Sequence, residues 1–376
     1  MKIIFYLCIS SLIPFIYGNG DSPHLETLNT IKNMAANNWT INNILLPLPN
    51  GYLGKGKFAF TYKGIFGPKN IEVAMKFTVL NEAAMYRKEY EMYTYLRAIN
   101  NETVEAYGIP AIYYFAPCFN CTYCVMAMTL LESKFQEHLG SKYTDMDILL
   151  ICREFVRIGK YIHSCGVRHN DIKFENFMFR RNQAFIIDFN LASKIFEKNA
   201  GGTIYFMSRR SHVTEERCPI DDFESFLYFI CMLGGVKLDW VNNPDLVGLP
   251  KKDLYRRIYN MKLNTDRTLE QIGKLTSKVL ENVYRVFAEL VFQCKDGFPP
   301  YDQMYGMIHD AIKSQVRLGF FPMVSWLSPA EKLNAHSYQI QNPRPRIEKI
   351  TDPRSIRSPE YPEVIWNFLF DLYHKK

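Results

Sequence analysis

The chain has no long run of basic residues, although Lys and Arg together outnumber Asp and Glu by 45 to 38. Its net charge of +7 is scattered along the sequence, so we expect no nucleic-acid partner. Charged residues make up only 22% of the chain and hydrophobic residues 48%, which excludes a disordered chain, a collagen and a coiled coil. The length of 376 residues leaves room for one large or two modest domains.

Hydrophobic runs that could cross a membrane are also missing. Residues 106–131 form an uncharged stretch of 26 residues, but two prolines and three cysteines interrupt it. We interpret this stretch as two apolar strands, about 111–116 and 122–129, within a buried sheet. We therefore expect no stable membrane span.

The first eighteen residues have the three parts of a secretory signal. Lys2 precedes fifteen uncharged residues, 3–17, which are too few for a membrane span, and small residues follow at Gly18 and Gly20. We therefore expect residues 1–18 to be a signal peptide and the protein to enter the secretory pathway or to be secreted. The alternatives are an uncleaved anchor or a wrongly assigned start codon, and a cytoplasmic or nuclear location.

Two further features bear on the compartment. N-x-[ST] sequons, which can accept glycans, occur at Asn38, Asn101 and Asn120. Removal of Cys8 with the signal leaves eight of the nine cysteines, an even number that permits disulfides. The C-x2-C-x2-C run at 118–124 offers three ligands and no neighbouring histidine, so we favour a disulfide or ordinary thiols there over a zinc site.

Hydrophobic periodicity divides the rest of the chain into a sheet-rich part and a helical part. Strand patterns dominate residues 45–130, with one helix expected over 81–98. Helical patterns in residues 131–320 cover 146–165, 222–233, 269–294 and 301–316. Residues 19–44 are expected to be an N-terminal extension. The Pro-rich tail, 321–376, ends in a pattern typical of a helix that docks on the body or, alternatively, binds a partner.

The sheet-rich part contains a candidate phosphate-binding motif. Gly54 and Gly56 lie between two strand patterns, where backbone amides can approach phosphate oxygens, although a plain hairpin turn would also explain them. The next strand ends in Lys76, which can reach the α- and β-phosphates of a nucleotide. Glu89 on the following helix can hold Lys76 by ion pairing, whereas Glu91 faces elsewhere on that helix.

Four polar residues of the helical part complete the candidate site. Asp171 can accept the proton of an attacking hydroxyl, and Lys173 can steady the transferred phosphoryl group. Asn176 can ligate a metal, and Asp188 can bind the Mg²⁺ that bridges the phosphates. Because this order and spacing rarely arise by chance, ATP and Mg²⁺ are the expected cofactors.

With these motifs the chain resembles the eukaryotic protein kinases, and within them the casein kinase 1 group, which includes the tau-tubulin kinases. The stretches that match this group are 161–164, 202–208 and 221–225. The Ala-Pro-Glu motif of other kinases is absent, as it is in this group. The resemblance covers about residues 45–320 and implies an α+β, bilobal kinase fold. Its small β-rich N-lobe would be 45–130 and its larger helical C-lobe 131–320.

The resemblance also implies residue roles and partners. Met128 would be the gatekeeper and Thr129 to Leu131 the adenine-binding hinge, so Met128 and Leu131 are expected to bind ATP. Asp222 would brace the catalytic loop from a buried helix. The implied activity is that of a Ser/Thr protein kinase, with ATP and protein substrates as partners and a monomer as the expected state. The alternative is a pseudokinase that serves as a binding module.

Four residues depart from the pattern of the group. Ala59 replaces the third glycine of the phosphate loop, which is expected to alter loop motion at this ATP-binding position. Asn170 replaces the arginine that would bind a phosphorylated activation segment, so we expect activity without that phosphorylation. Asn190 replaces the glycine after Asp-Phe, where asparagine can adopt a left-handed backbone. Tyr205 replaces an anion-binding arginine, so recognition of primed substrates would need the substitute charges of Arg209, Arg210, Lys251 and Lys252.

Overall fold

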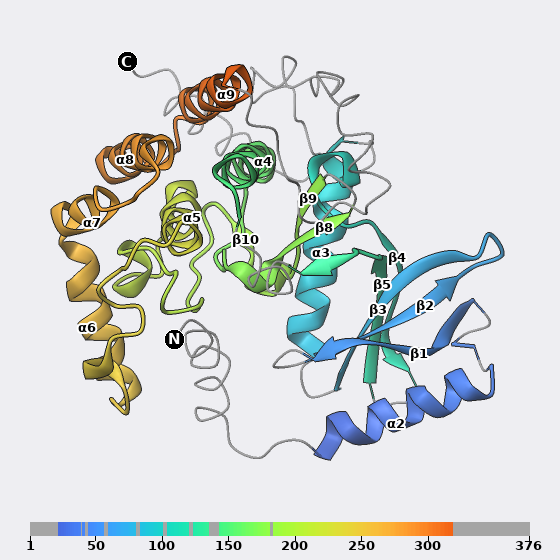
Figure 1. Cartoon of the computed structure of the whole chain (residues 1–376). Helices are drawn as coiled ribbons and strands as arrows, with labels where there is room; N and C mark the ends of the chain where they lie inside the picture. The colour runs from blue at the N-terminus through green and yellow to red at the C-terminus, as the bar shows by residue number, and fades with distance from the viewer. Residues whose placement is uncertain are drawn as a thin grey trace. The chain divides into compact units, whose positions relative to one another are not determined.

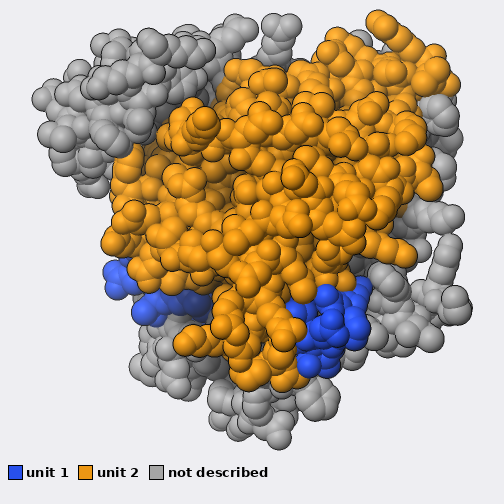
Figure 2. Space-filling model, turned by 90° about the vertical axis from the view of Figure 1, so that its left-hand side faces the viewer, with its two compact units in different colours: residues 1–93, 110–131, 242–247 blue, residues 94–109, 132–241, 248–376 orange. Residues whose placement is uncertain are grey.

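The computed structural model divides into two compact units, which are drawn as a ribbon in Figure 1 and coloured separately in Figure 2. Unit 1 comprises residues 1–93, 110–131 and 242–247, and unit 2 comprises residues 94–109, 132–241 and 248–376. Within these units the structure describes residues 22–38, 40–41, 44–55, 59–79, 83–100, 104–119, 123–134, 143–180 and 183–318.

Unit 1 is built on a five-stranded antiparallel sheet with the strand order β1-β2-β3-β5-β4. The strands are β1 (Leu45–Lys55), β2 (Ala59–Phe66), β3 (Ile71–Val79), β4 (Ile112–Phe119) and β5 (Tyr123–Thr129). Helix α2 (Ser22–Ala36) and the part of α3 (Ala83–Asn100) up to Tyr93 belong to the same unit. The uncharged stretch at 106–131 therefore contains a strand pair, as its pattern predicts.

The apolar core of unit 1 lies between α2 and one face of the sheet. Alternate residues of β3, Val73, Met75 and Phe77, are fully buried. Phe77 stacks on Phe60 with 5.2 Å between the ring centroids. The residues that α2 adds to this core are Ile31, Met34 and Ala35. Figure 1 shows α2 lying along the sheet, so part of the expected N-terminal extension is a helix that completes the core of unit 1.

Unit 2 is mainly helical. Its α-helices, besides the end of α3, are α4 (Asp145–Ser164), α5 (Pro219–Leu233), α6 (Lys251–Leu263), α7 (Thr265–Ile272), α8 (Lys278–Gln293) and α9 (Tyr301–Arg317). Helix α4 begins with a capping box, because the Thr144 hydroxyl accepts the Asp147 amide at 3.2 Å and the Asp147 carboxylate accepts the Thr144 amide at 3.0 Å. Helix α5, the most apolar of them, packs against α4 and α8 and is buried along most of its length.

Two small sheets and several 3₁₀ turns of unit 2 carry the polar motifs. The pair β7 (Val167–Arg168) and β10 (Ser193–Lys194) is antiparallel, as is the three-stranded sheet of β6 (Ser133–Lys134), β8 (Phe177–Arg180) and β9 (Gln183–Ile186). The 3₁₀ turns are η3 (Val104–Tyr107), η5 (Phe174–Asn176), η6 (Phe189–Leu191) and η7 (Arg210–His212), while η8 (Pro244–Leu246) is grouped with unit 1. The short strand pairs β7–β10 and β8–β9 fix the turns that connect them in this part of the chain.

The single helix expected over 269–294 is wrong, because the chain forms α7 and α8 there. Gly273 ends α7, and Ser277 begins α8 by accepting the amide of Leu280 at 3.2 Å. The apolar periodicity continues on both sides of this break, so periodicity alone did not show it. Helix α6 was not predicted, because most of its side chains are polar and only Ile258 and Lys262 are buried.

Several sequence-based expectations fall outside the described residues. They concern the signal peptide at 1–18, the terminal helix beyond 320, and Gly56, Asn101 and Asn120. Cys124, the last cysteine of the C-x2-C-x2-C run, is buried. In the described part of the chain, no helix combines the length and the hydrophobicity that a membrane span requires. The α+β class expected from the sequence is confirmed.

Candidate active site

The expected ion pair of unit 1 is formed by Lys76 and Glu89. Lys76 Nζ lies 2.9 Å from Glu89 Oε1 and 2.8 Å from Oε2, and the Glu89 side chain is fully buried. The Tyr86 ring lies 5.3 Å from the same ammonium and adds a cation–π contact. Glu91 is exposed and pairs with Arg87 at 3.2 Å, which confirms Glu89 as the partner. The pair fixes the lysine in one position on the sheet.

Lys76 lies on the face of the sheet opposite the α2 core. It is the strand partner of Met126, and Ala74 is the partner of Met128, so these four side chains share one face. Met128 is buried near the end of β5, and Leu131, just beyond it, is buried as well. The gatekeeper position predicted from the resemblance, Met128, therefore lies on the same sheet face as Lys76.

The structure describes the residues on either side of the glycine-rich turn, up to Lys55 and from Ala59 onward. Gly54, at a register irregularity of β1, has a φ of 149°, a conformation that favours glycine. Ala59 begins β2 opposite Thr78 and is buried. The third glycine position of the motif is therefore part of a strand here, where a methyl group fits the sheet.

The catalytic loop, residues 169–176, belongs to unit 2. Asp222 of α5 braces it. Its Oδ2 accepts the amide of His169 at 2.7 Å and its Oδ1 accepts the amide of Asn170 at 2.8 Å. His163 Nε2 lies 3.0 Å from Oδ2. Burial alone would raise the pKa of Asp222, but the hydrogen bond and charge of His163, with those of His169, outweigh it and lower the pKa. The bracing role predicted for Asp222 is confirmed.

Asp171 is the centre of a dense polar network. Its Oδ1 accepts the amide of Thr203 at 2.9 Å and the Thr203 hydroxyl at 2.8 Å, while its Oδ2 accepts Lys173 Nζ at 2.6 Å. Asn176 Nδ2 donates to the Asp171 carbonyl at 2.8 Å. Burial alone would lower the pKa of Lys173, but the adjacent Asp171 carboxylate outweighs it and raises the pKa. Both oxygens of the carboxylate are thereby oriented by fixed donors.

Thr203 is a site residue whose role the sequence does not indicate. The Gly-Thr stretch at 202–208 indicates only a resemblance to the family, although the threonine is the one hydroxyl residue at its start. In the structure its hydroxyl contacts Asp171 and also lies 3.3 Å from Lys173 Nζ. Thr203 therefore joins the segment after Asp188 to the catalytic loop.

Asp188 adopts the left-handed backbone that was expected at Asn190. Its φ is 68°, whereas Asn190 lies inside the η6 turn and is absent from the described residues with positive φ. The expectation for Asn190 is therefore wrong. His169 explains the difference, because its Nε2 lies 3.0 Å from the Ile187 carbonyl and its ring packs edge-on against Phe189 at 4.8 Å. These contacts hold both neighbours of Asp188.

Asn176 and Asp188 have the donor atoms that Mg²⁺ prefers. The Ile187 amide donates to the Asn176 carbonyl at 3.0 Å, so the two residues lie on adjacent chain segments. Asn176 Nδ2 is held by Asp171, which leaves Oδ1 as the ligating atom of the side chain. A carboxylate and an amide oxygen suit Mg²⁺ when substrate phosphates supply further ligands. The part of the chain that the structure describes contains no cluster of three or more His, Cys, Asp or Glu residues suited to a metal.

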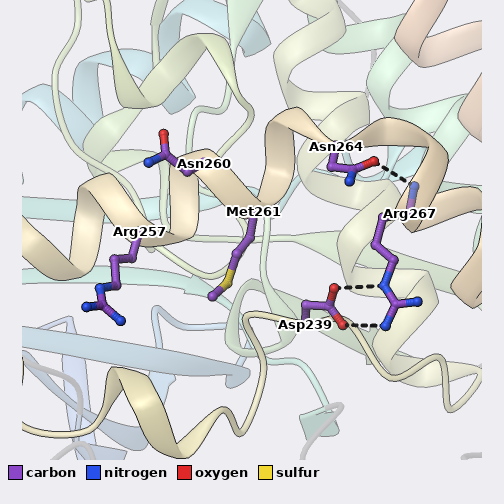
Figure 3. A pocket seen from close by; sticks show the side chains of 6 residues that line it. All are labelled: Asp239, Arg257, Asn260, Met261, Asn264 and Arg267. Atoms are coloured by element: carbon purple, nitrogen blue, oxygen red, sulfur yellow. Dashed lines mark hydrogen bonds and ion pairs between the residues drawn. The ribbon is translucent and has the colours of Figure 1, made fainter.

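An open pocket of about 350 Å³ is lined by Asp239 and by residues of α6, α7 and the turn between them, apart from these motifs in the chain (Figure 3). Figure 3 shows Asp239 facing the guanidinium of Arg267, with distances of 3.0 and 3.4 Å between paired atoms. Asn264 accepts the Arg267 amide at 3.0 Å. Because the charges of Asp239 and Arg267 neutralise each other, we assign this pair a structural role.

Comparisons with known proteins bear on the family that the chain resembles. Residues 49–214 match the protein kinase domain family. "Casein kinase I homolog 1" of Schizosaccharomyces pombe is 25% identical over 288 residues, which is 69% of this chain. The chain spans 60% of the length of that relative.

A solved structure supports the fold. The structure of vaccinia related kinase 3 matches 76% of this chain and 95% of that protein, with a TM-score of 0.55 and 13% sequence identity. At that identity the match bears on the fold alone, and it confirms a kinase fold with a β-sheet part and a helical part. Residues 49–214 are therefore similar to the protein kinase domain family, and the chain is similar to a casein kinase I homolog, as its motifs predict.

Proposed function

We propose that the protein is an active Ser/Thr protein kinase that transfers the γ-phosphoryl group of ATP to hydroxyl groups of protein substrates. The observation that carries this proposal is the orientation of Asp171 by Lys173 and Thr203. The residues of the phosphotransfer machinery are all present: Lys76, Glu89, Asp171, Lys173, Asn176 and Asp188. A chain that had lost the activity would not need to keep all of these side chains.

The proposed reaction depends on positioning and electrostatics more than on covalent chemistry. Lys76, held by Glu89, would bind the α- and β-phosphates. Asp171 would orient the acceptor hydroxyl and take its proton, while Lys173 would stabilise negative charge on the transferred group. Asn176 and Asp188 would hold Mg²⁺, which when bound neutralises phosphate charge.

Phosphate incorporation separates this proposal from the pseudokinase alternative. Purified protein is incubated with labelled ATP, Mg²⁺ and a panel of acidic and basic proteins, and nucleotide binding is measured in parallel by thermal stabilisation. Incorporation into serine or threonine supports the proposal. Nucleotide binding without incorporation into any substrate, or into the chain itself, would favour a binding module.

Replacing Lys76 with Met is expected to lower kcat/KM by about a hundredfold or more, because the phosphates lose a fixed cation and the buried Glu89 carboxylate loses its ammonium partner. Steady-state kinetics with varied ATP measures the effect. Lys63→Met is the matched control, since Lys63 lies in the same sheet and makes an exposed pair with Glu72 at 2.6 Å. Equal losses in the two variants would contradict the role of Lys76.

We also propose that the protein follows the secretory route. The motivation is the signal-like pattern of residues 1–18 and the sequon at Asn38, which is exposed at the end of α2. Expression in a eukaryotic secretory host is expected to give a new N-terminus and a mobility shift after glycosidase digestion. An intact Met1 in a cytosolic fraction, with no mobility shift, would overturn this proposal and leave the kinase assignment untouched.

A further inference from the structure

We propose that two buried arginines, Arg168 and Arg217, hold the segment 193–203 in its catalytic position and make its order independent of phosphorylation. The consequence for catalysis rests on the proposed kinase function. The ordering of the segment is a structural property that can be measured without activity. Both residues belong to unit 2, as does the whole segment.

Arg168 directly precedes the catalytic loop and is completely buried. One guanidinium nitrogen donates to the backbone carbonyl of Arg217, and the other donates to the carbonyls of Lys194 at 3.0 Å and Glu197 at 2.6 Å. The same nitrogen reaches the hydroxyl of Ser193 at 3.0 Å. A single planar side chain thus binds three residues of the segment and one residue beyond it.

Arg217 extends this arrangement to the end of the segment. Its side chain is buried, and its guanidinium donates to the carbonyl of Gly201 at 2.6 Å. Gly201 lies two residues before Thr203, which donates two hydrogen bonds to Asp171. The contacts therefore run from Arg168 through Arg217 and the segment to the catalytic carboxylate.

Among the described residues neither guanidinium group has an ion-pair partner within 4 Å, so other contacts must compensate for its burial. Burial lowers the pKa of both arginines, and the negative charges of Asp222 and Asp221 oppose that effect. Arginine nevertheless stays protonated in proteins, so the donors remain available at any physiological pH. The carbonyls of Lys194, Glu197 and Gly201 accept from these donors in the observed path of the segment.

The segment itself has little capacity to be switched by phosphate. Within it only Ser193 and Thr203 carry a hydroxyl group, and the Thr203 hydroxyl donates to Asp171 at 2.8 Å. Ser193 is 1% exposed, and its oxygen accepts from Arg168 and also from Asn170 Nδ2 at 2.9 Å. A kinase acting on this serine would first have to open the contacts that order the segment. The buried guanidinium groups therefore order the segment, as a phosphate bound to an arginine would do in a kinase that is activated by phosphorylation.

The test compares wild type, Arg168→Met, Arg217→Met and Arg168→Lys. The control is Arg180→Met, which removes an exposed arginine of the same unit that pairs with Glu105 at 3.2 Å. Hydrogen–deuterium exchange of residues 193–203 is measured, with α5 as the internal reference. We expect faster exchange of the segment in both Met variants and unchanged exchange in the control. Arg168→Lys keeps the charge without the planar fork, so we expect it to fold and to show an intermediate effect.

Kinetics supply the second readout. In both Met variants kcat is expected to fall about a hundredfold with little change in the KM for ATP, because the acceptor loses its orientation while the phosphate-binding residues are untouched. Wild type treated with phosphatase is expected to keep its activity. Wild-type exchange of the segment in Arg168→Met, or a loss above about tenfold on phosphatase treatment, would overturn the inference. An inactive wild type would refute the proposed function instead, and the exchange data would still decide the role of the arginines.

Discussion

Replacing Asp171 with Asn is expected to abolish phosphate transfer and to leave nucleotide binding nearly unchanged. The carboxylate accepts from Thr203 through one oxygen and from Lys173 through the other. An amide keeps the shape but cannot take a proton, and its NH₂ group would face one of these donors. A positioned general base contributes about 10²–10⁴-fold to a rate, and we expect a loss of that order in kcat.

Asp302→Asn is the control for this substitution. Asp302 is an exposed carboxylate of the same unit that pairs with Lys160 at 2.7 Å, and its loss is expected to leave turnover unchanged. Labelled-phosphate incorporation and nucleotide affinity are measured for both variants. Turnover of Asp171→Asn at the wild-type rate would show that this carboxylate is not the catalytic base.

Contacts between side chains that lie close in sequence could be predicted. The Lys76–Glu89 pair follows from a strand that ends in lysine and a helix that presents one acid to it, and helical geometry was sufficient to choose between two candidate acids. The two-part division also followed from periodicity, because strand and helix patterns occupy separate stretches of the chain. In these cases the type and the spacing of the side chains determine the structure.

The features that could not be predicted depend on backbone groups or on tertiary packing. Arg168 binds carbonyl oxygens up to 49 residues away, and no residue type marks a carbonyl that will accept a buried guanidinium. The left-handed conformation of Asp188 follows from the contacts of His169 with its neighbours. Helix α2 was missed because it is stabilised by the sheet on which it packs, and its three core residues are scattered among polar ones.

Replacing Asp222 with Asn is expected to cost about 3–5 kcal/mol in the free energy of unfolding, because a buried charge with several donors is lost and those donors remain buried. The carboxylate accepts the amides of His169 and Asn170, and the amide of the variant cannot accept from all of them. Denaturant unfolding measures the loss. Asp253→Asn, which removes an exposed pair with Arg256, is expected to change stability by less than about 0.5 kcal/mol.

The difference in stability between wild type and Asp222→Asn is expected to shrink in acid. The pKa of Asp222 is lowered in the folded protein, so the unfolded state binds its proton first and stability falls as the pH drops. The contribution of the carboxylate is complete above its unfolded pKa of about 4 and is lost as the pH falls through the folded value. Burial raises the pKa of the neighbouring Asp221 to about 6, but that residue is present in both proteins and its effect cancels.

Unfolding curves of wild type and Asp222→Asn at pH 5 and at lower values measure this difference in stability. A gap that stays constant down to pH 2 would show that Asp222 does not stabilise the catalytic loop through its charge.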